Sequence, residues 1–246
     1  MIPKIIHYCW FGKGEYPEKI KNCIDSWKIL NEDYQFMIWN EESFDIESFE
    51  FAREAYQAGK YAFVSDMVRF FALSQYGGIY LDTDVEVVRD FSEVLNNSVV
   101  LSGDESGNID GAFIAGVKGH PFFEEIFSMY QQMHFLNTDG SFNQTVINYW
   151  MQEILKKYGY CHANDCTVLT EDIHIFPAEY FCAMDQYTGK TYKTKNTFCI
   201  HHHTYLWTSK KTAFIRFIRT KILVPMIGRK RYFLLVNALK EKLKKN

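Results

Sequence analysis

The sequence predicts an α/β fold with a mostly parallel central sheet and a helical C-terminal tail. Segments with strand-like alternation and segments with helical periodicity take turns along residues 1–158, a succession that is typical of parallel sheets. Charge separates the tail from the rest. Residues 210–246 hold twelve of the 27 Lys and Arg and one of the 30 acids, which gives +11 there and −14 in residues 1–209. We therefore expect a main domain at residues 1–209 and a basic amphipathic tail at 210–246.

The elements of the main domain are predicted from periodicity and from glycine signals. A strand at residues 2–12 ends at Gly12 and is followed by a helix at 17–31, whose apolar stripe is Ile20, Cys23, Ile24 and Trp27. A helix at 60–76 ends at the pair Gly77-Gly78, which is typical of a C-cap. The other expected elements are strands at 34–40, 77–88, 98–104 and 111–119 and helices at 47–58, 121–135 and 142–158.

Composition and cysteine usage indicate an ordinary globular protein in a reducing compartment. The chain is 47% hydrophobic and 23% charged over 246 residues, enough for one sizeable core. Its six cysteines are scattered, the N-terminal apolar stretch is too short for a secretory signal, and no run reaches the roughly 18 apolar residues that span a bilayer. We expect free thiols and a cytoplasmic location. Cys161 and Cys166 lack zinc-knuckle spacing, so no structural zinc site is expected there.

The basic tail has apolar stretches on either side of Pro225 and Gly228, "FIRFIRTKILVPMIG" and "RYFLLVNALKEKLKK". A basic amphipathic helix can lie on an anionic lipid surface, where each Lys or Arg contributes on the order of 1 kcal/mol. We expect peripheral membrane association, and the alternative is a helical pair docked on the main domain. Nucleic acid is not an expected partner, because the main domain is acidic and repels phosphate backbones.

The stretch "GGIYLDTDVEVV" (residues 77–88) places carboxylates in a segment that is otherwise built like a buried strand. In extended chain, side chains at i and i+2 face the same way, so Asp82 and Asp84 converge on one point. A hard divalent cation, Mg²⁺ or Mn²⁺, relieves the repulsion between two such carboxylates. The alternative is an edge strand with solvated acids.

The helix that precedes this stretch adds a second set of polar residues. In "FVSDMVRFFALSQYGG", Ser65, Asp66 and Arg69 lie within one turn, with the acid and the arginine three residues apart on one face. Such a pair is usually a surface ion pair. Next to a metal-binding strand, however, the arginine can bind anionic oxygen and the aspartate can accept hydrogen bonds from sugar hydroxyls.

Four segments, "IPKIIHYCWFG", "SDMVRFFALSQYGGIYLDTDVEVV", "GHPFF" and "HHHTYLW", resemble in this order the DXD-containing glycosyltransferases of family 32. That family includes capsular and lipopolysaccharide sugar transferases and yeast mannosyltransferases, and it is distantly similar to the glucosyltransferase domains of clostridial toxins. The resemblance covers about residues 1–207. It implies a GT-A type, Rossmann-like nucleotide-sugar-binding fold for residues 1–209, a nucleotide-sugar donor, Mn²⁺ or Mg²⁺, and a retaining mechanism.

The resemblance also implies roles for individual residues. Asp84 matches the direct metal ligand, and Asp82 matches a group that binds the sugar or reaches the metal. His201 and His202 are candidate metal or phosphate ligands. The catalytic set is Asp82, Asp84 and Arg69. The base of the donor is expected to contact Trp10 and Tyr80. Its sugar and phosphates are expected to contact Ser65, Asp66, Arg69 and Asp82. Asp110 is expected near the sugar, and Trp207 over the diphosphate.

The function implied is hexose transfer. UDP-galactose or UDP-glucose is the first candidate donor, and GDP-mannose is the second. The acceptor is expected to be a lipid-linked saccharide in capsule, lipopolysaccharide or exopolysaccharide synthesis at the inner membrane face. Two alternatives stay open. "IYLDTDVE" is also similar to the opening of haloacid-dehalogenase-type phosphatases, in which Asp82 would be the nucleophile, although that motif normally opens its domain. The other alternative is a nucleotide or carbohydrate binder without catalysis on the same scaffold.

Overall fold

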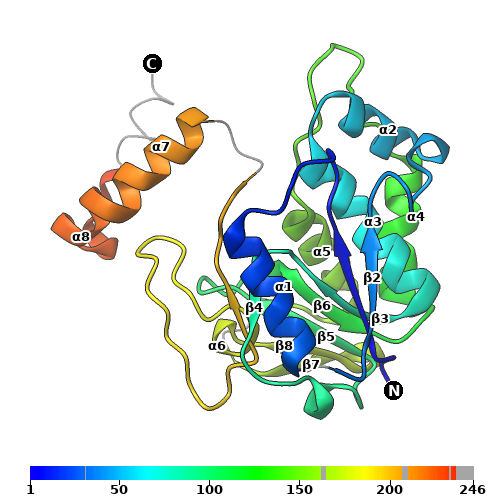
Figure 1. Cartoon of the computed structure of the whole chain (residues 1–246), viewed down its shortest axis with the longest axis horizontal. Coiled ribbons are helices and arrows are strands. Elements are labelled where there is room, and N and C mark those ends of the chain that lie inside the picture. The colour runs from blue at the N-terminus through cyan, green and yellow to red at the C-terminus, as the bar shows by residue number, and fades with distance from the viewer. Residues whose placement is uncertain (31, 162–164, 207–209, 233, 237–246) are drawn as a thin grey trace.

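The computed structural model describes residues 1–30, 32–161, 165–206, 210–232 and 234–236. A seven-stranded sheet has the order β2-β1-β3-β6-β5-β8-β7, and a separate two-stranded sheet pairs β4 with β9 (Figure 1). The strands are β1 (Ile5–Cys9), β2 (Gln35–Trp39), β3 (Gly78–Leu81), β4 (Val85–Val87), β5 (Val99–Gly103), β6 (Ile109–Gly116), β7 (Thr167–Leu169), β8 (Ile173–Phe176) and β9 (Cys199–His201).

Strands β2, β1, β3, β5 and β8 run in one direction, while β6 and β7 run against them. This is the mixed α/β fold with a mostly parallel central sheet that the sequence predicts for a GT-A type protein. Strand β1 has β2 on one side and β3 on the other, so the chain changes direction along the sheet between them. Ligands bind beyond the carboxyl ends of parallel strands at such switch points.

Two hydrophobic cores sandwich the sheet. One face is covered by α2 (Glu50–Gln57), α3 (Tyr61–Tyr76), α4 (Pro121–Gln132) and α5 (Ile147–Leu155). The other face is covered by α1 (Glu18–Leu30), the β4–β9 pair and α6 (Ala178–Phe181). Strand residues alternate between the cores: Ile79 and Leu81 face the second core and Tyr80 the first. The stripe predicted for residues 17–31 is confirmed, because Ile20, Cys23, Ile24 and Trp27 are all buried in α1.

The strand predicted at 77–88 is corrected by the structure. It is two strands, β3 and β4, which belong to different sheets and are separated by a turn at residues 82–84. The amide of Val85 donates to the carbonyl of Asp82 at 3.0 Å, and this hydrogen bond closes the turn. The acids therefore lie in a turn, where backbone direction changes, and strand alternation does not set their orientation.

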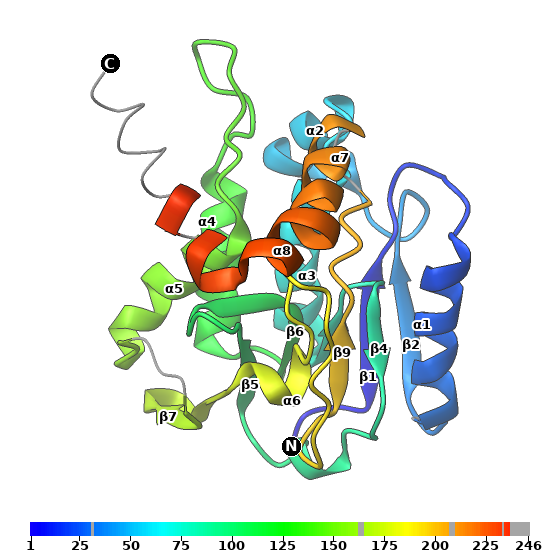
Figure 2. The same ribbon diagram turned by 90° about the vertical axis from the view of Figure 1, so that its left-hand side faces the viewer.

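The remaining predicted elements are present with shifted ends, but several observed elements were not predicted. These are β7, β8, α6 and β9, together with short 3₁₀ segments. Strand β9 pairs antiparallel with β4, with Val85 opposite His201 (Figure 2). This pairing brings residues 201–204 to the turn that carries the acids.

The described part of the tail is helical and is docked by its arginines. It consists of α7 (Lys210–Ile218), a π-helical turn (Arg219–Leu223) and α8 (Val224–Ile227), on the side of the molecule opposite α2 and α4 (Figure 1). Arg216 stacks on Tyr205 at 3.9 Å, and Arg229 binds Glu105 at 2.5 Å and Asp185 at 3.0 Å. Among the described helices, none combines the length and the apolar character that a bilayer crossing requires.

Gly78 is required for the close approach of β3 to β1. Its φ is +108°, and a Cβ there would lie 2.6 Å from the carbonyl oxygen of Ile5. We expect Gly78→Ala to lower the free energy of unfolding by at least about 2 kcal/mol, because it adds backbone strain to a clash with main chain. Gly14→Ala is the matched control, since nothing lies within 4 Å of its added Cβ. Chemical denaturation measures both, and equal midpoints for the two variants would contradict the argument.

Candidate functional site

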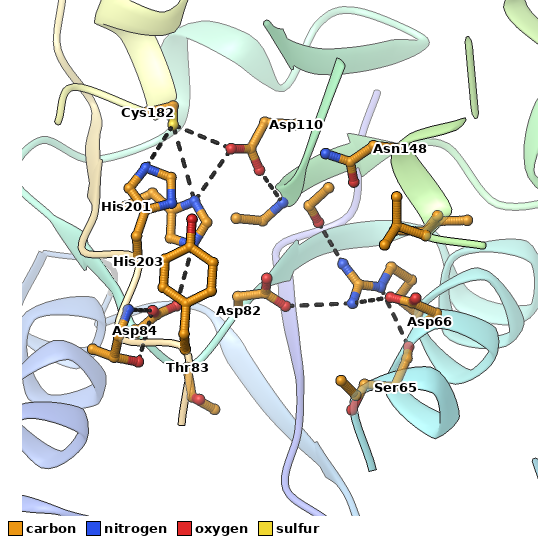
Figure 3. A pocket seen from close by; sticks show the side chains of 18 of the residues that line it. Ser65, Asp66, Asp82, Thr83, Asp84, Asp110, Asn148, Cys182, His201 and His203 are labelled. Atoms are coloured by element: carbon orange, nitrogen blue, oxygen red, sulfur yellow. Dashed lines mark hydrogen bonds and ion pairs between the residues drawn. The ribbon is translucent and has the colours of Figure 1, made fainter. Parts of the chain in front are cut away.

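A pocket of about 360 Å³ opens at the carboxyl edge of the sheet (Figure 3). This volume falls in the range of about 300–1,000 Å³ that is common for ligand sites. Its lining comes from the ends of β1, β3 and β5, from the start of β6, from α3 and from the segment after β9. Of the predicted site residues, the pocket wall contains Ser65, Asp66, Arg69, Tyr80, Asp82, Asp84, Asp110 and His201.

Arg69 is the central cation of one half of the pocket. Its guanidinium donates to the Gly111 carbonyl at 2.6 Å, to the Asp66 carboxylate at 2.7 Å and to the Ser65 carbonyl at 3.3 Å. It also lies 3.5 Å from Asp82 and stacks on the ring of Tyr80 at 4.5 Å. Arg69 is only 5% exposed, so this is a buried charge network and not the surface ion pair that was the alternative.

Burial changes the protonation of the carboxylates around Arg69. It raises the pKa of Asp66 to about 7, although the positive charge of Arg69 opposes the shift. The pKa of Asp82 is also raised, by burial first and by the negative charge of Asp84, against the opposing effect of Arg69. The buried carboxylates therefore repel one another, and an added cation would stabilise their charged forms.

The other half of the pocket holds a set of oxygen and nitrogen atoms that fits a divalent cation. Carboxylate oxygens of Asp82 and Asp84 and a nitrogen of His201 all lie within 4.8 Å of one another. One oxygen of Asp84 accepts from the amide and hydroxyl of Thr204, at 2.7 and 2.9 Å, while the other lies 3.4 Å from Nε2 of His201. Carboxylate oxygens are the ligands that Mn²⁺ and Mg²⁺ prefer, and an imidazole beside them suits a transition-metal ion such as Mn²⁺ better than Mg²⁺.

His201 is held between two carboxylates. Its Nε2 faces Asp84, and its Nδ1 lies 3.2 Å from Asp110. Although burial lowers the pKa of His201, the two negative charges outweigh this effect and raise it well above its usual value. Burial likewise opposes the low pKa of Asp84 and Asp110, which the imidazolium and hydrogen bonds bring below their usual range. The imidazolium thus occupies the electrostatic role that a metal ion would take.

Two predicted residues, His202 and Trp10, are placed differently from the expectation, and a third lies outside the described residues. His202 points away from the pocket and pairs with Glu86 at 2.8 Å, because neighbouring residues of an extended chain face opposite sides. It is therefore not placed as a metal ligand with the aspartates. Trp10 is buried against Tyr16, donates to the Gly14 carbonyl and does not line the pocket. Trp207 lies outside the described residues.

Among the pocket residues that sequence reasoning missed, Cys182, His203 and Thr204 contact the predicted acids or His201. Alternation along "HHHT" could have indicated His203, since residues i and i+2 face the same way as a strand ends. Nothing near Cys182 in the sequence carries such a signal, because α6 reaches the pocket only through the tertiary fold.

Comparison with known proteins confirms the resemblance described above. Residues 17–101 match the model of a family described as "Glycosyltransferase sugar-binding region containing DXD motif". Inositol phosphoceramide mannosyltransferase 3 of Schizosaccharomyces pombe is 35% identical over 133 residues, which cover 51% of this chain and 36% of that protein. An uncharacterized glycosyltransferase of Acanthamoeba polyphaga mimivirus is 26% identical over 216 residues, which cover 83% of this chain and 82% of that protein.

Among solved structures, the glycosyltransferase PaToxG has a TM-score of 0.46 and 20% identity, covering 63% of this chain and 68% of that one. The chain spans little more than a third of the length of the Schizosaccharomyces relative.

The Arg69 network gives a stability prediction. Arg69→Lys keeps one positive charge, but a single ammonium nitrogen replaces the three guanidinium nitrogens that now donate in different directions. Buried oxygens of Ser65, Asp66 or Gly111 therefore lose a donor. We expect the free energy of unfolding to fall by about 2 kcal/mol. Arg53→Lys, in a partly exposed pair with Glu50, is expected to change it by less than about 0.5 kcal/mol. Urea denaturation of both variants measures the difference, and a negligible effect at Arg69 would contradict the network.

Proposed function

We propose that this protein is a divalent-metal-dependent glycosyltransferase that moves a hexose from a nucleotide sugar to a saccharide acceptor. The observation that carries the proposal is the convergence of Asp82, Asp84 and His201 with the buried Arg69 in one pocket. A sugar nucleotide combines a diphosphate, which needs positive charge, with a polyol, which needs carboxylate acceptors. The pocket offers positive charge and carboxylate acceptors. They come from residues 17–101, which match the family model, and from residues that lie next to them in space.

The residues that would hold the metal are Asp82, Asp84 and His201, with Thr204 fixing the orientation of Asp84. The bound cation supplies positive charge for the diphosphate of the donor. Arg69 adds fixed positive charge on the other side of the pocket, where negative charge develops as the sugar–phosphate bond breaks. Tyr80 holds Asp82 in place by donating its hydroxyl hydrogen to the carboxylate at 2.9 Å.

We also propose retention of the anomeric configuration. Asp66, Asp82 and Asp110 are each engaged by a hydrogen bond or an ion pair, so none is arranged as a free base above the sugar. In the proposed step, the acceptor hydroxyl attacks the anomeric carbon as the bond to phosphate breaks, and its proton passes to the departing phosphate oxygen. Charge stabilisation of that leaving group is then the main contribution of the protein.

The donor is proposed to be UDP-galactose or UDP-glucose, with GDP-mannose as the second candidate. GDP-mannose is kept because the relative that is 35% identical is named a mannosyltransferase. That name also refers to a phosphoceramide acceptor, which supports the choice of a lipid-linked acceptor for this chain. A role in capsule, lipopolysaccharide or exopolysaccharide synthesis remains part of the proposal.

The tail supports a peripheral position on the inner membrane face. Arg216, Arg219 and Arg229 bind the main domain near the pocket rim, whereas Phe214 and Phe217 are 62% and 56% exposed. Exposed apolar side chains beside exposed Lys221, Lys230 and Arg231 fit the boundary of an anionic bilayer. A lipid-linked acceptor held there would reach the pocket from the membrane surface.

The phosphatase alternative is disfavoured by strand order. Strands β1 and β2 precede β3, so the acidic turn does not follow the first strand of the domain. Substitution of Asp82 or Asp84 distinguishes a transferase from the two alternatives. A phosphatase would depend on Asp82 as a covalent nucleophile, and a non-catalytic binder would show no turnover.

Asp84→Asn tests the metal-dependent step. We expect it to remove Mn²⁺-dependent stabilisation by the nucleotide and to lower turnover at least about 100-fold, because one charged ligand and its metal are lost. The measurements are thermal shift and transfer assays with UDP-galactose, UDP-glucose and GDP-mannose, with and without Mn²⁺.

Asp33→Asn is the matched control, since Asp33 is exposed and pairs with Lys4 on the surface. Wild-type activity that needs no metal, or an Asp84→Asn variant with full metal-dependent turnover, would contradict the proposal. Absence of stabilisation by every nucleotide would favour the phosphatase or binder alternatives.

Vesicle sedimentation tests the membrane proposal. We expect wild type to bind vesicles that contain phosphatidylserine and the double variant Phe214→Ser/Phe217→Ser to bind at least about tenfold more weakly, because each buried Phe contributes roughly 1.5–3 kcal/mol. Val168→Ser is the control, since Val168 is 63% exposed on the edge strand β7. Equal vesicle binding by the double variant and wild type, or no vesicle binding by wild type, would overturn the membrane proposal.

A further inference from the structure

A second group of potential ligand atoms meets at the other nitrogen of His201. While Nε2 of His201 faces Asp84, Nδ1 lies 3.2 Å from Asp110 Oδ2 and 3.9 Å from Cys182 Sγ (Figure 3). Cys182 Sγ in turn lies 3.2 Å from Asp110 Oδ2 and 3.7 Å from Nε2 of His203. The thiol is buried, at 2% exposure.

We propose that Cys182, His203, Asp110 and Nδ1 of His201 form a Zn²⁺ site directly beside the pocket for the nucleotide sugar. This site is distinct from the Asp82–Asp84 site in its ligand atoms, and it shares only the imidazole of His201.

The spacing of these atoms supports a tetrahedral ion. Zinc bonds of about 2.0–2.3 Å, arranged tetrahedrally, place the ligand atoms about 3.3–3.8 Å apart. The four measured separations run from 3.2 to 3.9 Å. The ligand atoms of Cys182, His201 and His203 also all lie within 4.8 Å of one another, which is compatible with one ion bound among them.

The chemistry of the ligand set selects a different metal from the one proposed for catalysis. A thiolate with imidazoles and one carboxylate is typical of Zn²⁺, whereas Mn²⁺ and Mg²⁺ prefer oxygen ligands. Binding of Zn²⁺ displaces the proton that the Cys182 thiol now shares with Asp110. Asp110 is already oriented for this, because its Oδ1 accepts from the amide of Ala112 at 2.7 Å and leaves Oδ2 for the ion.

The shared imidazole couples the two sites. A neutral imidazole has one nitrogen lone pair, so when Nδ1 of His201 binds zinc, Nε2 carries the proton and donates to Asp84. His201 is then unable to bind a second cation with Asp82 and Asp84. Zinc at this site is expected to weaken Mn²⁺ binding in the pocket. Only this expected weakening of Mn²⁺ binding rests on the proposed function. The zinc site itself does not.

The test uses Co²⁺ as a spectroscopic substitute for Zn²⁺ on the full chain. We expect wild type to show a sulfur-to-cobalt charge-transfer band and the visible bands of tetrahedral cobalt, and a single equivalent of Zn²⁺ to remove both. Cys182→Ser is expected to lose the charge-transfer band. Cys166→Ser, which changes an exposed cysteine, is expected to keep it. A wild type without the band, or a band that persists in Cys182→Ser, overturns the proposal.

Two more variants keep the result interpretable. His203→Gln retains the thiol but removes one ligand, so we expect it to bind Zn²⁺ at least about tenfold more weakly. Unchanged Zn²⁺ affinity of this variant would overturn the site. This result does not depend on whether Cys182→Ser folds. Asp84→Asn is expected to keep the cobalt band, although it removes Mn²⁺-dependent turnover. A missing band together with normal Mn²⁺ dependence therefore rejects the zinc site alone, whereas a normal band without any transfer activity rejects the proposed function alone.

Equilibrium dialysis measures the coupling. Wild type loaded with one equivalent of Zn²⁺ is expected to bind Mn²⁺ at least about tenfold more weakly than the zinc-free chain, because His201 is withdrawn from the Asp82–Asp84 site. Equal Mn²⁺ affinity in both states would overturn the shared role of His201.

Discussion

The concentration of negative charge in one buried pocket is the constraint on which the rest of the structure depends. Asp66, Asp84 and Asp110 are each 8% exposed or less, and Asp82 lies among them. Such a group is stable only if fixed positive charge and hydrogen-bond donors face it. Arg69 supplies the charge on one side and His201 on the other, each between two carboxylates. These two cations come from α3 and from the end of β9, segments that lie 132 positions apart along the chain.

Arg69 and His201 are positioned by different elements of the fold. Arg69 projects from α3, which ends at Gly77 and passes directly into β3, so the helix and the acidic turn are fixed by one short connection. His201 arrives through the β4–β9 pair, which lies outside the main sheet. The indole of Trp27 donates to the carbonyl of Val85 at 2.6 Å and ties this pair to α1. Packing on the second core therefore sets the position of the imidazole.

The pocket places hard and soft ligands on the two nitrogens of one imidazole. Carboxylate oxygens of Asp82 and Asp84 lie near Nε2, whereas the Asp110 carboxylate, the Cys182 thiol and a second imidazole lie near Nδ1. Under the two proposals above, the metal that is present decides whether His201 serves the site of Asp82 and Asp84 or the site of Cys182. The docked tail borders the same pocket, because Arg229 pairs with Glu105 and Arg216 stacks on Tyr205.

The sequence by itself determined the α/β class, most of the helices and strands up to residue 158 and the grouping of Asp66, Arg69, Asp82 and Asp84. These features are local: helical and strand periodicity, a glycine pair, and residues within 19 positions of one another along the chain. Only the tertiary structure decided that the acids lie in a turn, that His201 and not His202 meets them, and that Cys182 and His203 join them. Those decisions rest on the β4–β9 pairing and on α6, contacts between residues about a hundred positions apart that no local pattern encodes.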